Sequence, residues 1–446
     1  MLTGGCVMTD TARNFRRELN AELEYFEDRV GRDTESNRKG FVKLYPVDEA
    51  GRPLTNATVE LRQKTSDFDF GCNIFMLDEY DTPEENEIYK REFGKLFNLA
   101  VVPLYWEGTE PRQGILRYAK GSEPCYRRPP ADLVTEYCQK TGLRMKGHPL
   151  FWHEFVPHWL PTTTQELKRL LVKRFQEISQ RYANVIDSFD VVNEPSRIFD
   201  CNQRPDDRFY HLAMEENYCR WIFDLANRYF PANRLFLNDT VGAAFYDYRG
   251  EYSGYYQQLQ HLLSQGVRID GIGMQCHLGP IPGYENVFNS KRLYHVLDTY
   301  GRLNRPIHIS EISMASQWEG TDDQELQAEL AERLYRICFS HKNVQGIVWW
   351  NLPDTGILTE KHTSENLPSS GLLDGNYQEK QAYKVLHRLI HREWRTNETL
   401  KSHARDYVTT RAFYGRYAVT VNGRPAQEIH IAQDGPDEIR LILMDE

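Results

Sequence analysis

Short apolar strand segments alternate with amphipathic helical segments along most of this chain, and this alternation restricts its fold more than any other feature. Eight strand segments are evident, at 70–75, 99–105, 144–151, 185–193, 234–238, 271–277, 307–311 and 346–351. Helical patterns lie between them, at 83–97, 164–182, 207–230, 252–265 and 322–341. Strands that alternate with helices form parallel sheets, and eight such units close into a barrel. The sequence therefore predicts an α/β fold of the (β/α)8 TIM barrel type.

The segments outside the barrel predict a helical arm and a small β-module. A charged, helix-compatible stretch precedes residue 39, and two alternating segments at 41–47 and 57–62 flank a turn-rich stretch, which is typical of a β-hairpin. Three more strands, at 417–421, 428–431 and 440–443, follow the last barrel helix at 381–394. Three strands alone are marginally stable, so we expect them to pair with the hairpin. The expected divisions are 1–38 (N-terminal helical arm), 39–66 (β-hairpin), 67–395 (barrel) and 396–446 (C-terminal strands of the module).

Composition excludes several classes of partner. The 64 acidic residues exceed the 54 Lys and Arg residues, no basic run is present, and we expect no nucleic-acid partner. No window of about 20 apolar residues predicts a membrane span. No signal-peptide pattern begins the chain, so a cytoplasmic location is expected, or a periplasmic or secreted one if a leader has been removed. The eight cysteines form no CxxC pair, and we expect neither a metal nor a cofactor.

Two of the strand segments end in a glutamate. Asn193-Glu194 closes an apolar run and is followed by Pro195, and Glu311 lies at the end of 307–311. In such barrels the carboxyl ends of the strands form the active-site face. Hydrolysis of a glycosidic bond requires one protonated carboxyl and one carboxylate, so the pair predicts chemistry on a sugar linkage. Either glutamate taken alone is equally compatible with a helix cap or a solvent-facing acid.

Six segments resemble the motifs of glycoside hydrolase family 10, the retaining (β/α)8 endo-β-1,4-xylanases and their relatives. They are Gly-His-Pro-Leu-Phe-Trp-His (147–153), Asp-Val-Val-Asn-Glu-Pro (190–195), Leu-Phe-Leu-Asn-Asp (235–239), Gly-Ile-Gly-Met-Gln-Cys-His (271–277), His-Ile-Ser-Glu-Ile (308–312) and Val-Trp-Trp (348–350). The order and spacing agree over about residues 70–393. Asn-Glu-Pro by itself is a weak signal, because many related barrels carry it.

The resemblance implies a role for each matching residue. Glu194 would be the general acid/base and Glu311 the nucleophile, with His277 hydrogen-bonded to Glu311. A retaining mechanism would place the two carboxyls about 5–5.5 Å apart. The residues implied in carbohydrate binding are Asn193, His148 and Gln275, with His277 beside them and Trp152 and Trp349 as walls of the site. We also expect Asn238 and Tyr105 to contact the substrate.

The second strand departs from the family pattern. Where xylanases carry a Glu-Asn pair and a Lys that hold the neighbouring sugar, this chain has Val101, Val102 and Tyr105. Buried polar contacts set specificity sharply, so we expect an altered substrate: another β-linked glycan, a decorated oligosaccharide or a glycoside. The segment 352–372 also lacks the family's usual second tryptophan and instead carries Asp354, Lys361, His362 and Glu365.

Two other functions remain as alternatives. A metal-dependent barrel hydrolase would use His148, His153 and His277, but histidines five residues apart on a strand point to opposite faces. A glycan-binding barrel without catalysis is the second alternative. The presence of both Glu194 and Glu311 argues against it, because a protein that only binds has no need of two carboxylates at catalytic positions.

Overall fold

The computed structural model describes residues 10–198, 209–215, 217–278, 283–318, 320–356 and 367–443. Within these ranges, eight parallel strands form a closed barrel in the order β12-β3-β4-β5-β6-β7-β8-β9. They are β3 (Asp69–Asn73), β4 (Leu99–Pro103), β5 (Arg144–His148), β6 (Ser188–Asn193), β7 (Arg234–Asp239), β8 (Gly271–His277), β9 (Ile307–Ser313) and β12 (Val344–Trp349). The predicted (β/α)8 barrel is confirmed.

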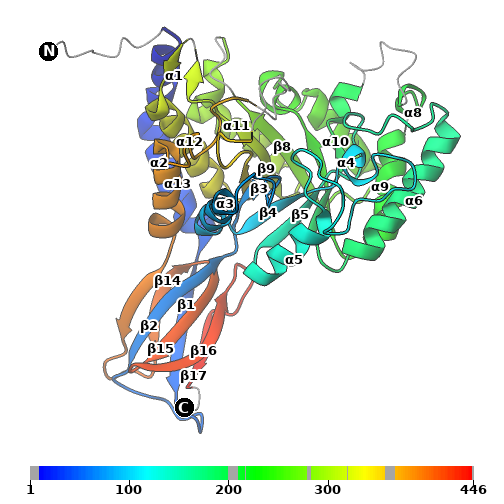
Figure 1. Ribbon diagram of the computed structural model, residues 1–446. Coiled ribbons are helices and arrows are strands. Elements are labelled where there is room, and N and C mark those ends of the chain that lie inside the picture. Colours follow the sequence, from blue (N-terminus) through cyan, green and yellow to red (C-terminus); the bar gives the residue numbers. More distant parts are fainter. Residues whose placement is uncertain are drawn as a thin grey trace.

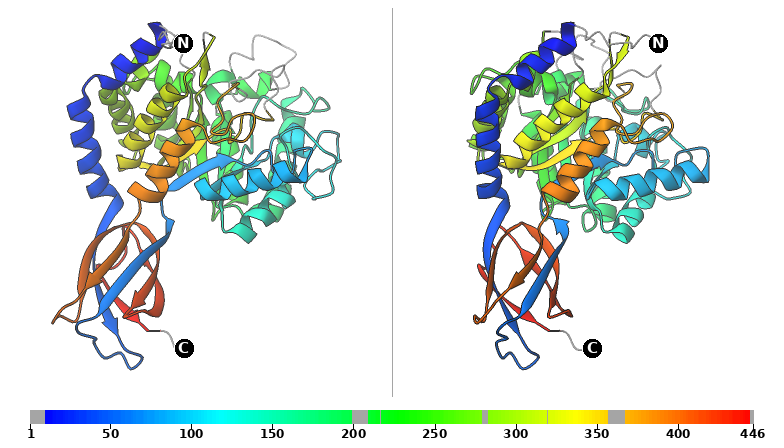
Figure 2. Two further views of the ribbon diagram at one scale, coloured as in Figure 1. Left: turned by 60° about the vertical axis from the view of Figure 1, so that its left-hand side comes forward. Right: turned by 90° about the vertical axis from the view of Figure 1, so that its left-hand side faces the viewer.

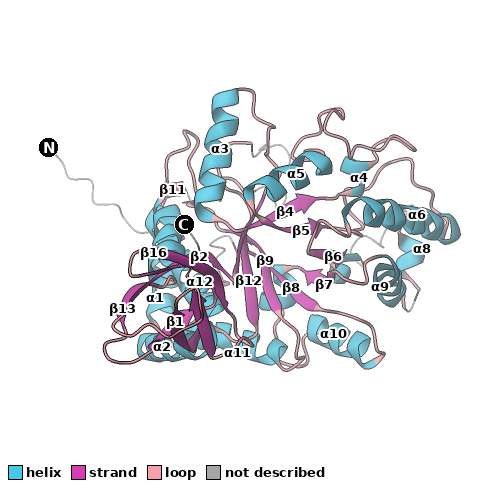
Figure 3. Ribbon diagram, turned by 90° about the horizontal axis from the view of Figure 1, so that it is seen from below, coloured by secondary structure: helices cyan, strands magenta, loops and turns pink. Residues whose placement is uncertain are grey.

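Helices surround the barrel strands (Figure 3). The longer ones are α3 (Pro83–Leu96), α5 (Ala131–Thr141), α6 (Thr164–Tyr182), α9 (Tyr218–Tyr229), α10 (Gly254–Ser264), α11 (Ser290–Gly301), α12 (Gln324–Ser340) and α13 (Gln381–Arg388), and the short ones include α4 (Trp106–Thr109) and α8 (Tyr210–Ala213). Local sequence sets their ends: Thr82 and Glu85 form a capping box at the start of α3. Among the described residues, every helix is too short or too polar to serve as a membrane span.

A buried ion pair lies inside the barrel. Lys146 Nζ on β5 is 2.7 Å from Asp190 Oδ1 on β6, and their side chains are 1% and 2% exposed. Burial raises the pKa of Asp190, but the Lys146 charge and a hydrogen bond from His148 outweigh it and hold that pKa below its usual value. An ionised Asp190 can only accept, so His148 donates from Nδ1 across 2.9 Å. The ion pair thereby fixes the orientation of His148.

The N-terminal arm is two helices packed on the barrel. They are α1 (Asp10–Asn20) and α2 (Leu23–Arg38), separated by Glu22 in the left-handed conformation (φ 58°). Phe15 and Phe26 are buried against the barrel helices. On α2, Arg29 pairs with Asp298 of α11 at 2.8 Å. These contacts hold both helices against the barrel (Figures 1 and 2).

The β-module is a two-sheet sandwich that projects from one end of the barrel (Figures 1 and 2). Its sheets have the orders β14-β1-β17 and β13-β2-β15-β16. The strands are β1 (Lys39–Val47), β2 (Thr58–Ser66), β13 (Asn397–Lys401), β14 (Val408–Phe413), β15 (Gly415–Val421), β16 (Arg424–Ile431) and β17 (Glu438–Ile442). The predicted hairpin is wrong, because β1 and β2 lie in different sheets and pair with C-terminal strands instead. The strands β13 and β14 were not predicted.

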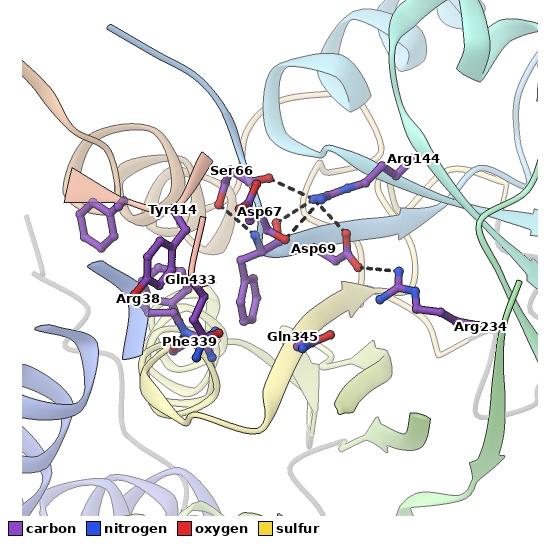
Figure 4. A pocket seen from close by; sticks show the side chains of 12 residues that line it. Arg38, Ser66, Asp67, Asp69, Arg144, Arg234, Phe339, Gln345, Tyr414 and Gln433 are labelled. Carbon is purple, nitrogen blue, oxygen red and sulfur yellow. Dashed lines mark hydrogen bonds and ion pairs between the residues drawn. The ribbon is translucent and has the colours of Figure 1, made fainter. Parts of the chain in front are cut away.

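The connection from β2 to β3 joins the module to the barrel and is held by an arginine (Figure 4). Arg144, at the start of β5, donates to the backbone oxygens of residues 66, 67 and 68 at 3.2, 3.2 and 3.0 Å. It also pairs with Asp69 at 2.8 Å, and Arg234 lies 3.7 Å from the other oxygen of that carboxylate. These residues border a cavity of about 200 Å³. Arg144 therefore fastens the module to the base of the barrel.

Candidate active site

The two predicted glutamates are buried at the carboxyl ends of their strands. Glu194 directly follows β6, and Glu311 lies within β9; they are 5% and 4% exposed. Glu194 adopts a left-handed backbone conformation (φ 52°), and its N–H donates to the carbonyl oxygen of Asn238 at 2.8 Å. Pro195 then begins a 3-10 turn. Such a conformation is costly for a residue other than glycine and is typical of functional sites, where the surrounding structure enforces it.

Three amide side chains connect the two carboxyl groups. Gln275 donates to Glu194 Oε1 at 2.9 Å and to Asn193 Oδ1 at 3.4 Å. Asn238 donates to the same Asn193 oxygen and to Glu311 Oε1, both at 2.7 Å. This continuous chain of hydrogen bonds spans β6, β7, β8 and β9 and brings both glutamates into one polar site.

The surroundings of the two glutamates differ. Burial raises the pKa of Glu194 to about 8, with a further contribution from the Glu311 charge, and the Gln275 hydrogen bond offsets part of the effect. Glu311 instead accepts two hydrogen bonds, from Asn238 at 2.7 Å and from His277 Nε2 at 3.1 Å. Near neutral pH, Glu194 is therefore the protonated member of the pair and is suited to donate a proton.

The two histidines predicted for the site both border Glu311. His277 Nε2 donates to Glu311, so its Nδ1 accepts from the Ser313 hydroxyl, 2.9 Å away. His148 Nε2 lies 3.9 Å from Glu311 Oε1, while its Nδ1 is bound to Asp190. Each ring is thus oriented by a second residue behind it.

The structure corrects the assignment of Trp349 as a wall of the site. Its indole donates to the carbonyl oxygen of Ser370 at 3.0 Å, and its ring belongs to the large core outside the barrel interior. The neighbouring Trp350 instead contacts both site histidines, with ring centres 5.5 Å from His148 and 6.0 Å from His277. Successive residues at a strand end face opposite sides, so only one of the two tryptophans can reach the site.

Two of the three departures on the second strand belong to an apolar cluster beside His148, whereas Val102 belongs to the large core. Val101 and Tyr105 belong to the apolar cluster together with Phe75 and Trp350, and Trp152 packs against it. The Tyr105 ring is 5.4 Å from His148 and 5.8 Å from Trp152. The guanidinium of Arg128 lies 3.5 Å from the centre of the same tyrosine ring. This side of the site therefore combines aromatic surface with a cation.

The segment after the last barrel strand is described only in part. Asp354 pairs with Lys380 at 2.6 Å and accepts a hydrogen bond from the N–H of Gly371 at 2.7 Å. Asp354 is therefore held by contacts within the protein. Lys361, His362 and Glu365 lie outside the described residues.

A cavity of about 760 Å³ opens on the Glu194 side of the site. Glu194, Gln275 and His277 line it, together with residues of the π-helical turn Gly242–Tyr246. Arg197, which was not predicted for the site, also lines it. A cavity of this size is typical of sites that enclose a small ligand.

A metal-dependent reaction has no support in this geometry. Within the ranges of the chain that the structure describes, no three His, Cys, Asp or Glu side chains are arranged to hold a metal ion. His148 and His277 are each held by hydrogen bonds within the protein. His153 is buried, and burial lowers its pKa to about 4.

Comparison with known proteins places the chain in a family. The family model for glycosyl hydrolase family 10 matches residues 61–389, which is most of the chain. The chain belongs to glycosyl hydrolase family 10.

Its curated relatives include proteins of different functions. The chain is 27% identical over 389 residues to the anti-sigma-I factor RsgI6 of Acetivibrio thermocellus, a match that covers 86% of this chain and 45% of that protein. It is 24% identical over 379 residues to endo-1,4-beta-xylanase 3 of Arabidopsis thaliana, with coverages of 84% and 44%. The chain thus spans less than half the length of these two relatives.

Solved structures share the barrel fold. Xylanase 10B from Thermotoga petrophila, solved with xylobiose, aligns with a TM-score of 0.57 at 20% identity, covering 74% of this chain and 99% of that one. Native xylanase 10B from Thermotoga maritima aligns with a TM-score of 0.58 at 20% identity, covering 73% of this chain and 96% of that one.

Proposed function

We propose that this protein is a retaining glycoside hydrolase that cleaves a β-linked glycan or oligosaccharide by double displacement. The observation that carries the proposal is the pair of buried glutamates, Glu194 and Glu311, joined through amide side chains yet held in different surroundings. Membership of glycosyl hydrolase family 10 supports the same reaction. The names of several relatives, endo-1,4-beta-xylanases, support a xylan-like substrate.

In the first step, Glu194 donates its proton to the leaving oxygen while a Glu311 carboxylate oxygen attacks the anomeric carbon. The bond from that carbon to the leaving oxygen breaks, and an ester to Glu311 forms. In the second step, the ionised Glu194 takes a proton from water, whose oxygen attacks the same carbon and releases Glu311. The raised pKa of Glu194 suits this sequence, because the residue must first be an acid and then a base.

The remaining site residues orient the two glutamates or bind the sugar. His277 and Asn238 hold the Glu311 carboxylate in place through their hydrogen bonds. Asn193, His148 and Gln275 present polar atoms at the same site, and we propose that they bind hydroxyl groups of the cleaved sugar.

We propose that the preferred substrate differs from plain linear xylan. The cluster that contains Val101 and Tyr105 presents mainly apolar and aromatic surface, with the Tyr105 hydroxyl among its few polar atoms, so it is poorly matched to a polar sugar face. A panel of aryl β-xyloside, aryl β-glucoside, linear xylan and decorated xylans measures this preference. A clear preference for linear xylan over the rest of the panel would overturn the altered specificity.

Glutamine variants test the assigned roles. We expect Glu311→Gln and Glu194→Gln each to lower kcat on a glycan by about a thousandfold, because each removes a proton donor or a nucleophile while keeping the shape of the side chain. Glu107→Gln, at an exposed glutamate of α4, is the matched control and should retain activity. Thermal unfolding of each variant verifies that the fold is kept.

Three outcomes would contradict the proposal. Unchanged hydrolysis by Glu311→Gln would reject that residue as the nucleophile. Mass spectrometry of the incubated glycans detects hydrolysis. Binding of glycans by the unmodified protein without any hydrolysis would favour the glycan-binding alternative. Proton NMR of the first product formed gives its anomeric configuration, and inversion would exclude the retaining mechanism.

A further inference from the structure

One arginine lies between the candidate acid/base and a second carboxylate. Arg197 is the last residue of the turn Pro195–Arg197 that follows Glu194. Its Nη1 is 3.4 Å from Glu194 Oε2, and its Nη2 is 3.6 Å from Glu154 Oε1. The arginine side chain is 44% exposed and lines the cavity on the Glu194 side. A single guanidinium thus faces two carboxyl groups at similar distances.

The double displacement requires Glu194 to be neutral at one stage and charged at the next. Glu194 is neutral when substrate binds, and it becomes a buried carboxylate once its proton has passed to the leaving oxygen. A buried carboxylate is costly unless a cation or several hydrogen bonds compensate it. In the described part of the chain, Arg197 is the cation in contact with this carboxyl. Gln275 occupies the other oxygen, Oε1, so Arg197 faces the oxygen that remains.

We propose that Arg197 is a positioning residue that is shared between two carboxylates. It pairs with Glu154 while Glu194 holds its proton, and it turns to Glu194 once that proton has been given to the leaving group. When water later returns a proton to Glu194, Arg197 pairs with Glu154 again. Arg197 itself forms and breaks no covalent bond. This inference rests on the proposed double displacement, and it adds a charge partner for the acid/base.

The other ionisable groups near Glu194 do not replace Arg197. Glu311 and Glu154 are negative and favour the protonated form of Glu194. Asp239 on β7 is bound to the Ser196 hydroxyl at 2.6 Å, and His277 on β8 is bound to Glu311. His153, which lies 3.9 Å from Glu154, is neutral near pH 7 because burial lowers its pKa to about 4.

Three variants of the full chain test the sharing of Arg197. In Arg197→Met the cation is lost, and we expect the titration midpoint of Glu194 to rise by about one pH unit. In Glu154→Gln the competing carboxylate is lost, and we expect the midpoint to fall by a similar amount, because the arginine is then free to pair with Glu194. In Arg197→Lys the charge is kept, and the midpoint should return toward that of the unmodified protein.

The measurement is carbon-13 NMR of protein labelled at the glutamate side-chain carboxyl. The Glu194 signal is assigned by its loss in Glu194→Gln, and its shift is followed with pH in each variant. Arg181→Met is the matched control, because Arg181 is also 44% exposed and pairs with Asp132 far from the site. It should leave the Glu194 titration unchanged.

The kinetic readout follows the second step. With an aryl glycoside whose leaving group is good, release of the glycosyl group from Glu311 limits turnover, and Arg197→Met should slow that release about tenfold. Unchanged Glu194 titration in both Arg197→Met and Glu154→Gln would overturn the shared pairing. If the unmodified protein hydrolyses no glycan, the proposed function fails, yet the NMR titration still decides whether Arg197 is shared.

Discussion

The buried Lys146–Asp190 pair allows a prediction that does not depend on the substrate. Replacing Lys146 with Met keeps an unbranched side chain of similar length but removes the charge 2.7 Å from Asp190. Both side chains are almost fully buried, so water cannot take the place of the ammonium. Asp190 then keeps its hydrogen bond from His148. Breaking a buried pair by removing one partner costs about 3–5 kcal/mol, and we expect a loss within that range.

A double-mutant cycle separates the pair from its surroundings. Asp190→Asn alone leaves an uncompensated buried ammonium and should be about as destabilising as Lys146→Met. The double variant buries no unpaired charge, so we expect it to lose about 2 kcal/mol less than the sum of the single variants. Urea-induced unfolding, followed by tryptophan fluorescence and by far-UV circular dichroism, measures all four proteins.

Two results would refute this reasoning. A Lys146→Met variant that is as stable as the unmodified protein would show that Asp190 does not need the charge of the lysine. A double variant whose loss equals the sum of the single losses would show that the two charges do not interact. A change in the steepness of the urea transition would instead indicate an altered unfolded state or an intermediate.

Two further predictions concern the acid/base and the β-module. Burial raises the pKa of Glu194 to about 8, so the protonated acid is present below that pH and is lost above it. We therefore expect kcat/KM to fall as the pH rises through about 8. A plateau of kcat/KM that extends to pH 10 would contradict the assignment. Arg144→Met removes three hydrogen bonds to the β2–β3 connection and the ion pair with Asp69. We expect limited proteolysis to cleave this variant more readily at residues 66–69. The control variant Arg181→Met should leave the cleavage pattern unchanged.

The barrel and the catalytic pair were predictable because their signals are local. A fully buried parallel strand is a short apolar run, and a polar residue at its end stands out against that run. Glu194 and Glu311 could be recognised in this way. Trp349 could not be separated from Trp350, since both faces of a buried strand are apolar and the sequence marks neither as the inner one.

The features that the sequence did not reveal depend on pairing between distant segments. Alternation identified β1 and β2 as strands, but it carries no information about partners, and the turn-rich stretch between them favoured a hairpin. In the structure, Val42 pairs with Thr410, far along the chain. The position of Arg197 between two carboxylates could not be predicted from the sequence either, because Glu154, its second partner, belongs to a different loop.

The β-module combines strands from the two ends of the chain, and this has a consequence for synthesis on the ribosome. More than three hundred residues separate β2 from β13, so the first two strands emerge long before the strands that will pair with them. During that interval their backbone edges and apolar faces have no native partner, and such segments are prone to associate with other chains. The barrel can form first, but the sandwich must wait for β13 to β17. We therefore expect a nascent chain of this protein to be prone to aggregation through β1 and β2 until β13 to β17 have been synthesised.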